Sequence, residues 1–68
     1  MNLLLLKEER TKRGITQEQL AKCLGFKSKS SYCLMEKGIT SISVDMANKI
    51  VVYLGLSKEM AYKIFFAK

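Results

Sequence analysis

Apolar residues recur at helical spacing along most of the chain, and four glycines interrupt that pattern. Each glycine follows a stretch of periodic apolar residues; the four are Gly14, Gly25, Gly38 and Gly55. Since glycine readily adopts the left-handed conformation found just past a helix end, this placement is typical of helix C-caps. The chain also contains no proline. The pattern predicts five helical segments, at residues 2–13, 17–24, 29–37 and 44–54 and after Ser57.

The second predicted segment carries the clearest helix signals. Thr16 is a good N-cap, and Gln19, three residues later, completes a capping box in which each side chain satisfies a free backbone N–H. Leu20, Ala21 and Leu24 then share one helical face. Cap, apolar face and the glycine that follows all indicate the same short helix.

The third predicted segment is also short, with Tyr32 and Met35 as its apolar pair. Residues 26–31, FKSKSS, connect the two segments and are cationic and rich in hydrogen-bond donors. Two short helices joined by a tight basic turn are what a helix-turn-helix DNA reader needs. We predict that Tyr32 is the core residue that opens the third helix and that Phe26 covers the turn.

The first and fourth segments hold more apolar residues than one core-facing stripe requires. In the first segment Leu3 and Leu6 are the predicted inward pair, which leaves Leu4 and Leu5 over. The fourth segment, residues 44–54, is apolar on nearly every side. Such a helix normally lies at the centre of a core, and we predict that position for it.

Serines precede the last two predicted helices. Either Ser41 or Ser43 can cap the fourth helix, and Ser57 can cap the fifth. The fifth helix has a core-facing stripe and two further aromatic residues. The stripe is Met60, Ala61, Ile64 and Phe65, and the two left over are Tyr62 and Phe66. We interpret the surplus as a self-association surface. The alternative is a disordered chain end that exposes Phe65 and Phe66.

Length and charge narrow the class of protein. Residues 1–68 are expected to form a single domain, without room for a separate catalytic or effector domain. Twelve Lys and Arg against six Asp and Glu give a net charge of +6. This excess favours an anionic partner, of which nucleic acid is the commonest, over a merely solvated basic surface.

No apolar run suggests a membrane protein. The longest, Ile50–Leu56, is far shorter than the ~20 residues that span a bilayer. Leu3–Leu6 is too short for a signal-peptide apolar region and has no basic segment before it. We therefore expect a cytoplasmic protein without a membrane partner.

The residues that carry most enzyme chemistry are scarce. Cys23 and Cys33 are the only cysteines and there is no histidine, so a zinc site would lack two soft ligands. In a reducing compartment both cysteines are expected to be small, partly buried apolar residues, with a redox switch as the alternative. No glycine-rich phosphate loop or pair of carboxylates stands out. We predict no enzyme activity, metal, cofactor or small-molecule substrate.

Three short motifs carry a family resemblance: Thr16-Gln17-Glu18-Gln19-Leu20-Ala21, then Leu24-Gly25, then Glu36-Lys37-Gly38. Together they resemble the Cro and lambdoid-repressor, or XRE-type, helix-turn-helix domains. The likeness extends over most of the chain. It implies a compact all-α, five-helix, lambda-repressor-like bundle with the helix-turn-helix motif at the second and third helices. It also implies DNA binding, often as a dimer on near-palindromic operators.

The resemblance assigns site roles by position. The third helix would lie in the major groove and read base edges. The residues that would face the bases are Ser28, Lys29, Ser30, Ser31 and Leu34. Those that would contact phosphates are Gln17, Lys27, Lys37 and Ser41. Leu34 stands where the family often has a polar residue; it could touch a thymine methyl group or be an exposed leucine with no role.

A structural ion pair is also implied. Arg10 and Glu36 match positions that the family uses to join the first helix to the end of the third. The alternative is two independent, solvated charges.

Two departures from the family pattern concern packing and register. The interval from Gly25 to Gly38 is one residue longer than the common spacing, so an extra residue lies within 26–31. A shift of one position rotates a helix by about 100°, which affects the base-contact assignments most. Glu9 occupies a position that is usually apolar.

These observations predict a sequence-specific, double-stranded-DNA-binding transcription regulator of the phage or mobile-element repressor type. It would act as a homodimer through the helix at 44–54 and the helix after Ser57. The surplus apolar residues of these helices motivate the alternative, a protein-interaction module on the same scaffold, such as an antitoxin-like or regulatory partner.

Overall fold

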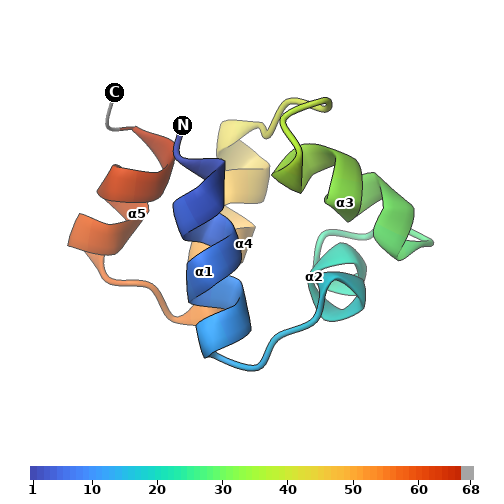
Figure 1. Ribbon diagram of the computed structural model, residues 1–68, viewed down its shortest axis with the longest axis horizontal. Coiled ribbons are helices and arrows are strands. Elements are labelled where there is room, and N and C mark those ends of the chain that lie inside the picture. The colour runs from blue at the N-terminus through green and yellow to red at the C-terminus, as the bar shows by residue number, and fades with distance from the viewer. Residues whose placement is uncertain (67–68) are drawn as a thin grey trace.

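The computed structural model describes residues 1–66. This part of the chain contains five helices joined by short connections. They are α1 (Leu3–Lys12), α2 (Gln17–Cys23), α3 (Lys29–Glu36), α4 (Val44–Leu54) and α5 (Lys58–Phe65) (Figure 1). The predicted all-α fold is confirmed, and each predicted helix end lies within one residue of the observed end. The last two residues of the predicted domain 1–68 lie outside the described residues.

Figure 1 shows α1 across the middle of the bundle, with α5 on one side, α2 and α3 on the other, and α4 behind. The start of α1 lies beside the end of α5, where the backbone N–H of Asn2 donates to the carbonyl oxygen of Ile64 at 2.6 Å. Six large side chains are fully buried between the helices of the described residues, and every helix contributes at least one. They are Leu6, Leu20, Tyr32, Met35, Ile50 and Ile64. Tyr32 is thus a core residue as predicted, and Phe26 is half-buried against the core.

Side chains cap four of the five helices at their N-terminal ends. Asn2 accepts from the Leu5 N–H, and Thr16 forms the predicted reciprocal capping box. Ser43, one of the two serines proposed for α4, accepts from the Met46 N–H, and Ser57 accepts from the Met60 N–H. Local sequence therefore determines where these helices begin.

The end of α3 is a Schellman motif centred on Gly38. The Gly38 N–H donates to the Met35 carbonyl and the Ile39 N–H donates to the Leu34 carbonyl, both at 3.0 Å. Gly38 has φ of +81°, and a Cβ there would lie 3.3 Å from Leu3 Cδ1. Glycine at this position both permits the turn and lets α1 approach the end of α3.

The prediction that α4 lies at the centre of the core is wrong for its outer face. Ala47, Ile50 and Leu54 are buried, whereas Val44 and Val52 are exposed, Val52 to 81%. The other helices of this small bundle cover only one side of α4, so Val52 lies on an outer side that also carries the exposed polar residues Asp45, Asn48 and Lys49.

The fifth helix follows its predicted stripe. Ile64 and Phe65 are buried, and Tyr62 and Phe66 are exposed. The alternative of a disordered chain end that exposes both Phe65 and Phe66 is therefore wrong for Phe65, which is buried in α5, whereas Phe66 is exposed.

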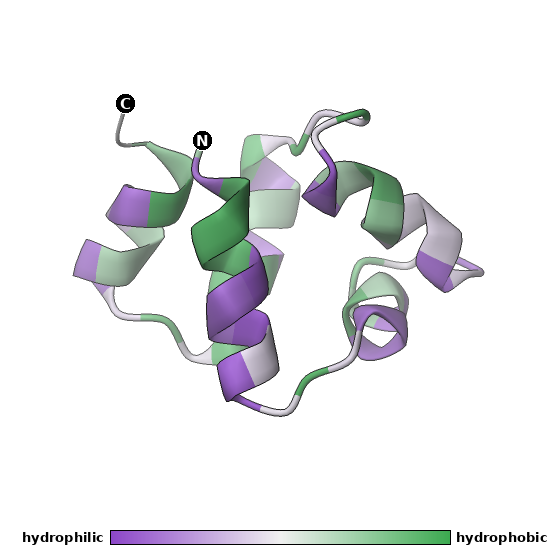
Figure 2. Cartoon of the chain, in the orientation of Figure 1, coloured by the Kyte–Doolittle hydropathy of each residue, from purple (hydrophilic) through white to green (hydrophobic). Residues whose placement is uncertain are grey.

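Helix α1 changes character along its length, as Figure 2 shows: its first residues are hydrophobic and its later ones hydrophilic. Leu6 is buried, while Leu4 is exposed. Glu9, at the usually apolar position, is also buried and forms an ion pair with Arg13. The hydrogen bond from Arg13 holds the pKa of Glu9 below its ordinary value, with Lys12 adding to the effect. A local partner thus lets a carboxylate take the place of an apolar side chain.

Candidate nucleic-acid interface

Helix α3 has one buried side and one exposed side. Tyr32 and Met35 are fully buried. On the opposite side, Ser30, Leu34 and Lys37 are exposed at spacings of four and three residues, so they form one stripe along the helix. This stripe is the surface that α3 can offer to a partner.

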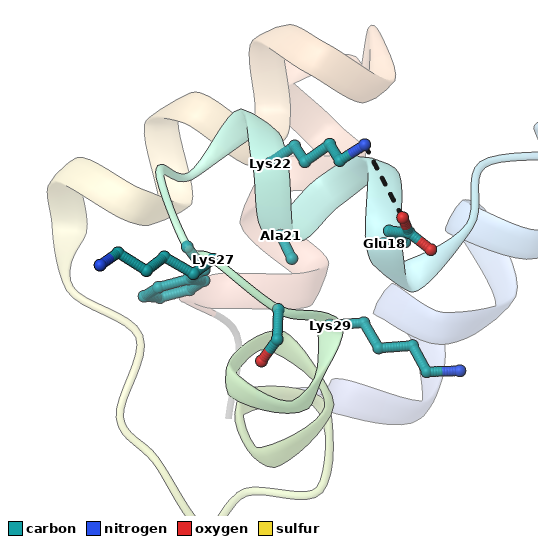
Figure 3. A pocket seen from close by; sticks show the side chains of 7 residues that line it. Glu18, Ala21, Lys22, Lys27 and Lys29 are labelled. Carbon is teal, nitrogen blue, oxygen red and sulfur yellow. Dashed lines mark ion pairs between the residues drawn. The ribbon is translucent and has the colours of Figure 1, made fainter.

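The basic turn before α3 surrounds a hollow of about 270 Å³. Figure 3 shows its lining: Lys22 is directed toward Glu18, with which it forms an ion pair at 3.7 Å, while Lys27 and Lys29 extend in different directions. Lys27 and Lys29 are exposed, as is Lys37 at the other end of the helix. None of these last three lysines forms an ion pair within residues 1–66. Their positive charges are therefore uncompensated on the surface around α3.

Ser28 occupies the N-cap position of α3 but makes no side-chain capping hydrogen bond. Its hydroxyl is exposed. The start of α3 at Lys29 is the predicted one. Tyr32 points into the core, which fixes the outward direction of Ser30 and leaves Ser31 half-buried on the flank.

Gln17, the first residue of α2, is half-buried. Its Nε2 donates to Oε1 of Glu36 at 3.5 Å, a long hydrogen bond. Gln17 and Lys29 also line one shared hollow of about 580 Å³ between the start of α2 and the start of α3. The structure therefore brings together a predicted phosphate-contacting amide and a predicted base-contacting lysine.

Arg10 and Glu36 form a two-pronged ion pair. Arg10 Nε donates to Glu36 Oε2 at 3.0 Å and Nη2 donates to Oε1 at 3.1 Å. The third prong, Nη1, donates to the Ile15 carbonyl at 2.7 Å. The two side chains are only 8% and 4% exposed, so the alternative of independent, solvated charges is wrong. The pair joins α1 to the end of α3 and holds Glu36 where it meets Gln17.

The hydroxyl of Tyr32 is buried near this ion pair. Burial raises the pKa of Tyr32 well above its ordinary value, and the Glu36 carboxylate raises it further. The hydroxyl makes no hydrogen bond by distance and angle within the described residues. The raised pKa keeps the tyrosine protonated at neutral pH, and its ring packs in the core.

Lys37 and Ser41 lie away from the basic turn. Lys37 is the C-cap of α3, and Ser41 is exposed in the connection to α4. Ser41 lines a separate hollow of about 370 Å³ with Gly38 and Met1. The predicted phosphate-contacting residues thus form two groups, one at each end of α3.

Cys33 was not among the predicted contacts. It is half-exposed on α3, one turn after Lys29 and one turn before Lys37, on the flank of the exposed stripe. The spacing of four residues from both lysines is the sequence signal that could have identified it.

Two other kinds of site were sought within residues 1–66. No helix there is long and apolar enough to cross a membrane. No group of three or more His, Cys, Asp or Glu side chains is placed to hold a metal ion.

Comparison with known proteins gives one match. Residues 6–60 match a family model described as Helix-turn-helix. Neither the curated proteins nor the solved structures contain a significant match.

Proposed function

Because the chain belongs to the helix-turn-helix family of DNA-binding regulators, of the Cro and lambdoid-repressor type, we propose that it is a sequence-specific repressor of the phage or mobile-element kind. Helix α3 enters the major groove of double-stranded DNA with its exposed stripe toward the bases. The observation that carries this proposal is the set of three uncompensated lysines around the exposed side of α3.

Lys27 and Lys37 suit a phosphate-binding role by their positions, and Lys29 lies between them at the start of the base-facing side. Lys27 and Lys29 lie at the start of α3 and Lys37 lies at its end. A helix in the major groove has a phosphate backbone on either side, so cations at both ends can fix its register. Between them, the exposed Ser30 hydroxyl can donate to or accept from base edges, as can that of Ser28.

The Arg10–Glu36 pair supports this reading of α3 as a positioned element. A helix of eight residues is marginal by itself, and it must be held firmly to place side chains against bases. The ion pair anchors it to α1, and Glu36 in turn meets the amide of Gln17. Gln17 stands at the positive end of the α2 dipole, where a DNA phosphate is favoured.

We further propose that two copies bind one near-palindromic operator, with the interface supplied by α4 and α5. The exposed apolar side chains of these helices support it: Val44, Val52 and Tyr53 on α4, and Tyr62 and Phe66 on α5. A two-fold pair of subunits would set the two α3 helices ~34 Å apart, one turn of DNA.

The test is fluorescence anisotropy with random and selected duplex DNA over a salt series. We expect affinity that falls steeply as salt is added, because bound lysines release counterions from DNA. Lys27→Glu with Lys29→Glu should weaken binding and reduce the slope of log K against log salt by about 2, roughly one per phosphate contact. Lys7→Glu with Lys58→Glu is the matched control, since both lysines are exposed and the net charge changes equally.

Equal losses in the two double variants would contradict a specific role for the turn. Absence of binding to any DNA at any salt concentration would refute the proposal.

The exposed apolar surface of α4 and α5 also favours a second candidate, a protein-interaction module such as an antitoxin-like partner. Unchanged regulation in cells that carry the Lys27→Glu and Lys29→Glu variant would favour this second candidate over DNA binding.

A further inference from the structure

The base-reading surface of α3 has an unusual composition. Between Lys29 and Glu36 there is no Arg, Asn or Gln, so Lys29 is the one side chain in this range of a type that makes bidentate contacts to guanine or adenine. Serine hydroxyls can both donate and accept, so they discriminate little between bases. The sequence information that α3 can read directly must come largely from its other exposed side chains.

Leu34 lies in the middle of the exposed stripe. It is 40% exposed, four residues after Ser30 and three before Lys37, on the side opposite to Tyr32. If α3 lies in the major groove, Leu34 faces the bases rather than the phosphates. The group in that groove that suits an apolar side chain is the 5-methyl group of thymine.

A structural role for Leu34 is insufficient to account for its position. Its carbonyl accepts from the Ile39 N–H in the Schellman motif, and an apolar contact between these two residues often accompanies such a motif. Ile39, however, is itself 71% exposed. Substantial leucine surface therefore stays open to a partner.

The surroundings of Leu34 indicate which partner covers it. Lys29 and Lys37 lie on the same helix, are exposed, and make no ion pair within residues 1–66. This charge is complementary to a polyanion and not to a second copy of a chain whose net charge is +6. An apolar side chain between two such cations is suited to the floor of a DNA groove.

We propose that Leu34 is a specificity-determining residue that contacts the 5-methyl group of a thymine, so that each half-site contains a thymine opposite the middle of α3. This inference rests on the proposed DNA-binding function. The leucine takes the methyl group out of water, whereas the other pyrimidine, cytosine, offers no methyl group at that position.

The experiment starts from an operator selected from a random DNA pool. Each thymine is replaced in turn by uracil, which removes only the methyl group, and affinity is measured by anisotropy. At one thymine per half-site we expect roughly fourfold weaker binding for each contacted methyl group. With Leu34→Ala the uracil substitution at that position should cost nothing, while Ile39→Ala, the control, should keep the fourfold effect.

Leu34→Gln is a second variant that keeps a long side chain and tests the same point if the alanine variant folds poorly. It too should be insensitive to the uracil substitution. DNA binding with no thymine whose methyl effect depends on Leu34 would overturn the inference and leave the proposed function intact. Failure to bind any DNA would overturn both, and would be seen before any uracil is introduced.

Discussion

The α2–α3 pair and the α4–α5 pair bury their inner sides in the same way but differ on their outer sides. The outer side of α3 carries hydroxyls and lysines around a single leucine. The outer sides of α4 and α5 carry valine, tyrosine and phenylalanine, with Val52 exposed to 81% and Tyr62 to 60%. Cationic, hydrogen-bonding surface suits DNA, and large apolar surface suits a protein.

This contrast suggests that the two helices differ in how firmly the rest of the bundle must hold them. A base-reading helix must hold its direction, and α3 is fixed by the shielded pair of Arg10 and Glu36. None of the ion pairs of α4 within residues 1–66 is shielded in this way: Lys49 and Asp45 are both exposed. Substitutions in the two regions should therefore affect different properties. Those at the ion pair should change stability, and those on the exposed sides of α4 and α5 should change self-association.

The largest effect is expected from Glu36→Ala. It leaves the buried guanidinium of Arg10 without its carboxylate, with only the Ile15 carbonyl as partner, and loss of one side of a buried ion pair costs about 3–5 kcal/mol in comparable cases. That is a large fraction of the total stability of a small domain. Urea unfolding followed by circular dichroism measures the loss. Glu18→Ala removes an exposed ion pair with Lys22 and should cost no more than about 1 kcal/mol. Similar costs for the two variants would show that the Arg10–Glu36 pair is not shielded in solution.

The second largest effect is expected on α4, in the proposed dimer interface. Val52→Asp should leave folding nearly unchanged, because Val52 is almost fully exposed, but it should break the proposed dimer. A monomer engages one half-site at a time, so affinity for a palindromic operator should fall roughly 100-fold or more, while half-site binding persists. Sedimentation measures the loss of the dimer, and anisotropy measures the affinity for the palindromic operator and for a single half-site.

Two matched variants locate the interface more sharply. Tyr62→Asp tests α5, and Leu4→Asp is a control on the exposed side of α1. Cys23 lines a hollow of about 330 Å³ beside Val52 and Tyr53 on α4. Alkylation of this thiol in a Cys33→Ser background should therefore slow when the dimer forms. If none of the aspartate variants changes the sedimentation coefficient, α4 and α5 are not the interface.

The sequence predicted helix positions better than it predicted surfaces. Caps and glycines depend on a few neighbouring residues, so the helix ends were correct to within one residue. Val52 and Ile50 are similar residues two positions apart, yet one is exposed and the other fully buried. Val52 lies among the exposed polar residues Asp45, Asn48 and Lys49, and the prediction of a central helix, which rested on the number of apolar residues, overlooked this polar side.

The candidate site likewise has features that the sequence predicted and features that it did not. Family motifs located α3, and its outward stripe followed once Tyr32 was recognised as a core residue. The bond from Gln17 to Glu36 depends on how α2 and α3 cross. That crossing is set by packing between segments, which no local pattern encodes.

For Tyr32, burial could be predicted from the sequence, but the hydrogen bonding of its hydroxyl could not. That hydroxyl has no hydrogen bond within residues 1–66, and an unsatisfied buried polar group costs about 1–3 kcal/mol. Tyr32→Phe should therefore raise the free energy of unfolding, by about 1 kcal/mol at neutral pH, without changing DNA affinity. Urea unfolding and anisotropy measure the two quantities.

The pH dependence provides an independent check on Tyr32. Its pKa is raised in the folded protein, so above pH of about 10 the unfolded chain loses this proton while the folded chain keeps it. Stability should therefore fall in that range, and the phenylalanine variant should lack this part of the fall. A loss of about 1 kcal/mol in Tyr32→Phe at neutral pH would instead mean that the hydroxyl donates to Glu36. In that case, the hydroxyl would help to hold the Glu36 carboxylate, one turn along the same helix, in the position where it meets Arg10.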